Sequence, residues 1–71
     1  MSYARFRQKV ALKIKKARQK AAITQEGMEK HGFNIRHYQD IEGGKVNITL
    51  QTFYRLAKAF KTAPGRLIGS K

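Results

Sequence analysis

Apolar residues recur at helical spacing in the first part of the chain. Phe6, Val10, Ile14 and Ala17 lie at i, i+4, i+8 and i+11, which places them on one stripe of an α-helix. No segment alternates between apolar and polar residues for more than a few positions, so strands are not expected. The pattern predicts one helix from Ser2 to Lys20.

The same stretch carries a second stripe, which is entirely cationic. Neighbouring like charges on a helix repel each other weakly, so such a stripe slightly destabilises the helix that carries it. A solvated face and a phosphate-facing surface both account for it, and the sequence leaves both interpretations open. The stripe consists of Arg5, Lys9, Lys13, Lys16 and Lys20.

A second, shorter helix is expected at about Gln25 to Lys30, with Met28 as its main buried side chain. Thr24 is a favourable N-cap residue for it. Gly27 inside this helix costs up to ~1 kcal/mol relative to alanine. A glycine at this position is explained if another backbone passes close to it. Gly32 follows at the position of a left-handed C-terminal cap.

A third helix is predicted from Ile35 to Glu42, with Asn34 as its N-cap and Gly43-Gly44 as its end. Tyr38 and Ile41 are three residues apart and are expected to point inward, as is Phe33 just before the helix. The side chains expected to point outward or to the flank are Ile35, Arg36, Gln39 and Asp40.

The last part of the chain predicts two more helices after a loop at Lys45 to Ile48. One helix runs from about Leu50 to Lys61 with Thr49 as N-cap, and a final turn covers Pro64 to Ile68. Ala63 is a poor N-cap, so this turn is expected to be the least stable element. Residues 70–71 are expected to form a tail. The apolar stripe of the longer helix consists of Leu50, Phe53, Leu56, Ala57 and Phe60.

Five short helices with brief connections predict an all-α fold in a single domain, residues 1–71. A chain of 71 residues buries only about 60% of its unfolded surface, and without cysteine no disulfide can stabilise it. Tight helix packing or a dimer interface is expected to supply the missing stability.

The charge of the chain indicates the class of its partner. Sixteen lysines and arginines stand against four acids, a net charge of +12, which attracts polyanions. No apolar run approaches the roughly 20 residues that span a bilayer, and the first ten residues lack a signal-peptide core. A cytoplasmic location near nucleic acid is the expectation.

No set of residues predicts an enzyme or a metal site. His31 and His37 lie across a predicted turn without cysteine or a carboxylate cluster, which is weak support for a metal. No nucleophile, base and orienting group occur together, and no phosphate-binding glycine loop is present. We expect no catalytic activity, no cofactor and no metal. His37 is either an ordinary surface histidine or a pH-sensitive donor at a phosphate.

An ordered set of short motifs is similar to the helix-turn-helix domain of phage repressor and Cro proteins, the XRE family. The motifs occur in the family's order, cover about residues 8–69, and together imply a compact five-helix domain of the lambda-repressor-like type. They are Ile14-x-x-x-Arg18, Thr24-Gln25-Glu26, Gly32, Ile41-Glu42-x-Gly44, Leu56-Ala57-Lys58-Ala59-Phe60 and Leu67-Ile68.

The resemblance implies roles for matching positions. Arg18 and Glu42 correspond to a partly buried structural ion pair between the first helix and the end of the recognition helix. Base edges in the major groove would be read by Ile35, Arg36, Gln39 and Asp40, with Arg36 suited to guanine, Ile35 to a thymine methyl and Asp40 to a cytosine amino group. Phosphate contacts would come from Gln25, Asn34, His37 and Lys45.

The chain departs from the family pattern at three points. The span from Thr24 to Gly32 is one residue shorter than usual, and Gly27 or Glu29 takes the place of the family's small packing residue. Tyr38 replaces an aliphatic residue, so its hydroxyl needs a hydrogen-bond partner or reaches the DNA boundary. Asp40 is an acid at a base-reading position.

The expected function is sequence-specific binding of double-stranded DNA by a transcriptional regulator that reads the major groove with Asn34 to Glu42. An antitoxin or a restriction–modification controller on the same fold, or a non-specific basic protein of nucleic acid or ribosomes, is the alternative. A homodimer is expected, with Phe60, Leu67 and Ile68 as candidates for its surface or for the core. The sequence leaves a further protein partner open, and no small-molecule effector is implied.

Overall fold

The computed structural model describes residues 1–69 and is all-helical over that range. Its elements are α1 (Tyr3–Lys20), the 3₁₀ helix η1 (Glu26–His31), α2 (Ile35–Glu42), α3 (Leu50–Ala59) and α4 (Pro64–Ile68). The expectation of five helices and no strand is therefore confirmed for the described residues. None of these helices is long and apolar enough to cross a membrane.

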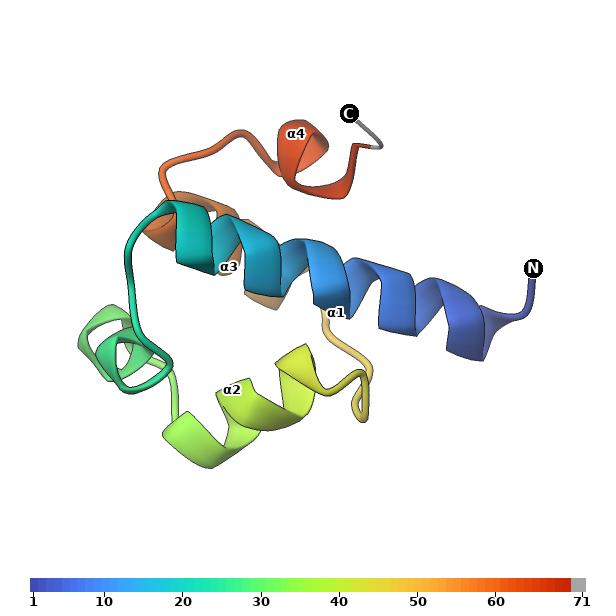
Figure 1. Ribbon diagram of the computed structural model, residues 1–71, viewed down its shortest axis with the longest axis horizontal. Helices are drawn as coiled ribbons and strands as arrows, with labels where there is room; N and C mark the ends of the chain where they lie inside the picture. Colours follow the sequence, from blue (N-terminus) through green and yellow to red (C-terminus); the bar gives the residue numbers. More distant parts are fainter. Residues whose placement is uncertain (70–71) are drawn as a thin grey trace.

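Helix α1 is the central element of the fold (Figure 1). It contacts α2 on one side and α4 on another, while α3 packs against α4. A single core fills the space between the helices. Its buried residues are Ile14, Met28, Phe33, Tyr38, Ile41, Leu56, Ala57, Phe60 and Leu67.

The predicted N-caps Asn34 and Thr49 form where the sequence places them, whereas the N-cap of η1 is Gln25, one residue after the predicted Thr24. The Asn34 side chain accepts a hydrogen bond from His37 N at 3.0 Å, and the Thr49 hydroxyl accepts one from Thr52 N at 3.0 Å. The Thr24 hydroxyl accepts one from Gly27 N at 2.9 Å. Each bond satisfies one of the amide groups that a helix start leaves without an intrahelical partner.

Four of the five helices in residues 1–69 end in the same left-handed motif. The residues with positive φ are Ala22, Gly32, Gly44 and Lys61. In each case the next amide bonds to a carbonyl five residues back, as Lys45 N does to Asp40 O at 3.0 Å. This is the Schellman arrangement, in which glycine is favoured because it lacks a Cβ.

Gly44 also has a packing role in addition to its backbone conformation. A Cβ at this position would come within 3.1 Å of Gln8 Cγ and 3.3 Å of Gln8 Cα. The end of α2 therefore lies almost against the backbone of α1. Gly27 behaves differently from the prediction, because its nearest neighbours are the side chains of Ile23 and Thr24 rather than another backbone.

Several sequence expectations about elements are wrong in detail. Helix α3 ends at Ala59 instead of Lys61, because Lys61 adopts the left-handed conformation that stops the helix. Leu50, predicted to face the core, is 89% exposed at the first position of α3. The second helix is a 3₁₀ helix shifted by one residue to Glu26–His31. The predicted tail, residues 70–71, lies outside the described residues.

Candidate nucleic-acid interface

Helix α2 presents one buried face and one outward face. Tyr38 and Ile41 are fully buried, as predicted, while Arg36 and Gln39 are exposed. At 100° per residue, Arg36 lies near the centre of the outward face, with Gly43 next to it two turns later. Arg36 makes no side-chain hydrogen bond within residues 1–69, so its guanidinium is available to a ligand.

The other predicted base-reading residues lie at the edges of this face. Gln39 is exposed, and Ile35 and Asp40 are half-buried on opposite flanks of Arg36. Ile35 lies closer to the buried side, beside Glu42, which is seven residues and about two turns further on. The four residues share one accessible side of α2, with Arg36 the most prominent.

Lys45 extends the outward face beyond the end of the helix. Its amide is bonded to Asp40 O at 3.0 Å, which fixes the backbone at this point. Its side chain lies over Gly43, since a Cβ on Gly43 would be 3.6 Å from Lys45 Cε. The Lys45 side chain therefore lies on the same side of the molecule as Arg36.

The opposite side of α2 is anchored by the carboxylate of Glu42. Arg18 of α1 donates to it twice, with Nε–Oε2 at 2.5 Å and Nη2–Oε1 at 3.3 Å. Gln25 Nε2 donates to Oε1 at 3.0 Å, and the Tyr38 hydroxyl donates to Oε2. A third donor of Arg18, Nη1, bonds to Ile23 O at 2.8 Å. The ion pair implied by the resemblance is present.

This network is well shielded from solvent, and every one of its buried polar groups is paired. The Glu42 side chain is 4% exposed and that of Arg18 is 10% exposed. No buried side-chain nitrogen or oxygen in residues 1–69 lacks a hydrogen-bond partner. Because the network joins α1, the start of η1 and α2, it fixes α2 relative to the rest of the domain.

The network shifts the ionisation of its members. Burial alone raises the pKa of Glu42, but the hydrogen bonds from Arg18, Tyr38 and Gln25 outweigh it, so the pKa lies below its usual value. The hydrogen bond to Glu42 raises the pKa of Arg18. Burial, followed by the bond to Glu42, raises the pKa of Tyr38 well above its usual value. All three groups therefore keep their neutral-pH states.

Gln25 connects the buried network to the outward face. Its amide nitrogen donates to Glu42, while its Oε1 accepts from Gln39 Nε2 at 3.2 Å. Gln39 is thereby oriented by a residue of the preceding segment. The predicted phosphate contact of Gln25 stays a prediction, and one of its two amide hydrogens is already used within the protein.

The turn before α2 is held by a residue that the sequence did not single out. Arg55 of α3 donates from Nη2 to Gly32 O at 3.0 Å, and its guanidinium lies 4.5 Å from the centroid of the Phe33 ring. Phe33 in turn packs edge-on against Tyr38, with centroids 6.0 Å apart. The sequence contains a signal for this role. Arg55 directly precedes Leu56 on the apolar stripe, so its side chain is expected at the edge of the buried face, within reach of a neighbouring turn.

The remaining candidates are on the surface. His37 is exposed on the flank of the outward face, and Asn34 uses its side-chain oxygen for the helix cap, which leaves its amide group exposed to solvent. His31 is also exposed, and no group of three metal-ligating side chains occurs within the described part of the chain.

The cationic stripe of α1 faces away from α2. Ala11 and Arg18 mark the side of α1 that meets α2, and the stripe lies roughly opposite to them by helical spacing. Lys13 departs from the expected solvated or phosphate-facing role, because its Nζ donates to Gly69 O at 2.6 Å and ties α1 to the end of α4. The others, Arg5, Lys9, Lys16 and Lys20, are exposed.

No protein-family model, curated protein or solved structure shows a significant match to this chain.

Proposed function

We propose that this chain is a sequence-specific double-stranded DNA-binding domain of a transcriptional regulator, arranged like a lambda-repressor-type helix-turn-helix. In this arrangement η1 and α2 form the motif, and α2 enters the major groove. The observation that carries the proposal is the division of α2 into an anchored side at Glu42 and an accessible side at Arg36. Recognition needs both properties, because a base-reading side chain discriminates only when its helix is held in place.

The chemistry of the accessible side fits base recognition. Arg36 can donate two parallel hydrogen bonds to guanine O6 and N7, the commonest specific contact in the major groove. Gln39, oriented by Gln25, can bond to a neighbouring base or phosphate. Lys45 is positioned to neutralise a phosphate at the groove edge. Asp40 can accept from a cytosine amino group and disfavours sites that bring a phosphate close.

The charge of the whole molecule supports the same proposal. A net charge of +12 raises the rate at which the domain meets DNA, although α1's stripe faces away from α2. These distant cations contribute long-range attraction rather than contacts to the same duplex. The protein would therefore act with DNA in the cytoplasm, and its affinity should fall steeply as salt rises.

Two copies on neighbouring half-sites, about 34 Å apart, are part of the proposal. Of the three residues considered for a contact between copies, Phe60 and Leu67 are buried in the core and only Ile68 is exposed. Free copies, each with a net charge of +12, repel each other. Pairing is therefore expected on DNA, where phosphates neutralise this charge, and sedimentation of the complex should give two copies per palindromic site.

Competition binding tests the proposal against the non-specific alternative. Binding sites are first selected from random duplex DNA, and the selected duplex then competes with random duplex DNA and with RNA of equal length. Specific recognition predicts that the selected duplex competes at least ~10³-fold better at physiological salt. Equal competition by all three nucleic acids would refute sequence-specific regulation and favour a general basic nucleic-acid binder.

A further inference from the structure

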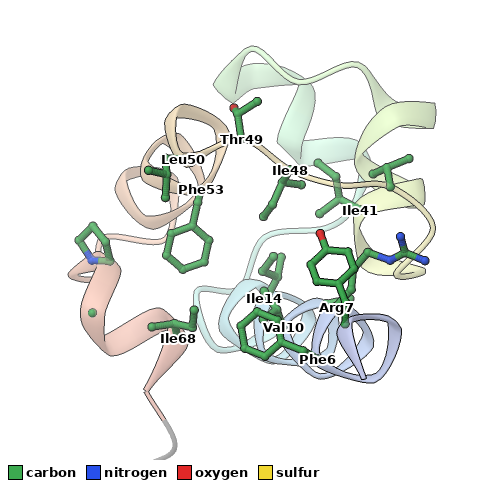
Figure 2. A pocket seen from close by; sticks show the side chains of 15 residues that line it. Phe6, Arg7, Val10, Ile14, Ile41, Ile48, Thr49, Leu50, Phe53 and Ile68 are labelled. Atoms are coloured by element: carbon green, nitrogen blue, oxygen red, sulfur yellow. The ribbon is translucent and has the colours of Figure 1, made fainter. Parts of the chain in front are cut away.

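An apolar pocket opens between α1, α3, α4 and the loop before α3 (Figure 2). Its volume is about 450 Å³. Phe6 and Val10 line it from α1, Ile48 from the loop, Leu50 and Phe53 from α3, and Ile68 from α4. Arg7 is the single charged residue that lines it, and Arg7 Nε is already bonded to Gly44 O at 2.8 Å.

Several large apolar side chains that line this pocket are exposed to solvent. Leu50 is 89% exposed, Tyr3 59%, and Phe6 and Ile68 43% each. Isolated exposed apolar residues need no explanation, but a group of them around a concave apolar surface marks an interaction site. These side chains are not part of the buried core, although Phe6 and Leu50 lie on the apolar stripes that the helical pattern predicts.

The pocket is separate from the outward face of α2. The α2 residue that reaches it is Ile41, on the buried side of the helix. Arg36 lies about 140° around the helix from Ile41, since the two are five residues apart. A partner in the pocket would therefore leave Arg36 accessible, so the domain could hold that partner and DNA at the same time.

The charges around the pocket select the kind of partner. None of the four acids of the chain lines it, because all of them lie between Glu26 and Glu42. Arg7 lines the pocket, and the Lys13 ammonium lies at the end of α4 next to Ile68, because its Nζ donates to Gly69 O at 2.6 Å. The charged groups at the rim are therefore cationic. A second copy of the chain would place the same cations against each other.

From this charge complementarity we infer that the pocket binds an amphipathic helix of an acidic protein. Apolar side chains of that helix, at i, i+3 and i+4 or i+7 spacing, enter between Phe6, Leu50 and Ile68, and acidic residues on its flanks meet the cations of the rim. A bound strand is excluded as the mode, because residues 1–69 contain no sheet edge to extend. The inference does not depend on the DNA-binding proposal.

The test uses two designed helical peptides of about 16 residues, the length of an ordinary globular helix. Both carry leucine at the spacing above, and one has glutamate on its flanks where the other has lysine. Binding is followed by amide chemical shifts of the ¹⁵N-labelled protein. The glutamate peptide should shift Val10, Ile48 and Phe53 and bind at least tenfold more tightly than the lysine peptide.

Three variants make the test specific. Leu50→Ala removes an exposed pocket side chain and should weaken binding of the glutamate peptide at least tenfold. Leu12→Ala is the matched control, because Leu12 is 50% exposed on α1 but does not line the pocket, and it should leave binding unchanged. Arg36→Ala should also leave it unchanged, so a failure here is separable from a failure of DNA binding.

Four results would overturn the inference. These are shifts confined to residues outside the pocket, equal binding of both peptides, and equal effects of Leu50→Ala and Leu12→Ala. The fourth is a concentration-dependent shift of the pocket amides without peptide, abolished by Leu50→Ala, which would assign the pocket to a second copy.

Discussion

Glu42 is the residue on which the position of α2 depends most directly. Its carboxylate receives hydrogen bonds from α1, from the segment before η1 and from its own helix. The partners Arg18 and Glu42 could be inferred from the sequence by resemblance, and Tyr38 could be seen to need a partner for its hydroxyl. That Tyr38 and Gln25 share this carboxylate could not be predicted, because it depends on how α2 crosses the preceding segment.

Replacing Glu42 with glutamine should destabilise the domain strongly. The substitution keeps the size of the side chain but leaves the Arg18 charge buried without a counter-charge, which costs about 3–5 kcal/mol. Urea unfolding followed by circular dichroism measures the loss. Glu29→Gln, at an exposed position of η1, is the matched control and should change stability by less than ~0.5 kcal/mol.

The lowered pKa of Glu42 makes stability depend on pH in a defined direction. Because the folded-state pKa lies below the unfolded value of about 4.3, the stabilisation is complete above that value and is lost as pH falls through the folded pKa. The melting temperature should be nearly constant from neutral pH to about 5 and should fall at lower pH. Glu42→Gln should have a shallower acid dependence, and parallel curves for the two proteins would contradict this assignment.

At the scale of elements, the sequence predicts a helix boundary best where a residue at that boundary carries a local signal. Asn34 and Thr49 are strong local signals because their side chains bond to amides three residues ahead. Ala22 and Lys61 carry no such signal, since neither alanine nor lysine favours the left-handed conformation that each adopts here. The predicted extension of α3 to Lys61 failed for this reason.

These two positions predict stabilising substitutions. A left-handed non-glycine residue costs about 1–2 kcal/mol, while glycine costs about 0.5–1 kcal/mol through the entropy of the unfolded chain. Ala22→Gly and Lys61→Gly should therefore each raise the free energy of unfolding by up to ~1 kcal/mol. The control Lys58→Gly makes the same change within α3 and should lower it by a similar amount. Destabilisation by Lys61→Gly would contradict the assigned backbone conformation.

At the scale of the whole molecule, the charge and the apolar surface are distributed unevenly. Arg36 and Lys45 lie on one side, the exposed cations of α1 on another, and the apolar pocket between α1, α3 and α4. The sequence predicts the first two groups from composition and spacing. It could not predict the pocket, because Leu50 and Phe6 continue apolar stripes, and their exposure depends on how the helices pack together.

Salt dependence distinguishes electrostatic attraction from base recognition. Removing Lys45, which is positioned at a phosphate, should weaken binding to all sequences and lower the slope of log affinity against log salt by about 1. Fluorescence anisotropy with the selected duplex at several salt concentrations measures this slope. Binding that hardly weakens between low and moderate salt would exclude a phosphate-based interface, and Lys16→Ala should reduce the slope less than Lys45→Ala.

The central claim, that α2 reads bases through Arg36, is tested most directly by selecting binding sites from random DNA with the parent protein and with Arg36→Ala. We predict a palindromic consensus that relaxes at one base pair per half-site in the variant, a loss of about 1–3 kcal/mol of discrimination. Arg5→Ala, which removes the same charge from the exposed far side of α1, should retain the full consensus. An unchanged consensus with Arg36→Ala, or the absence of any consensus with the parent protein, would contradict the claim.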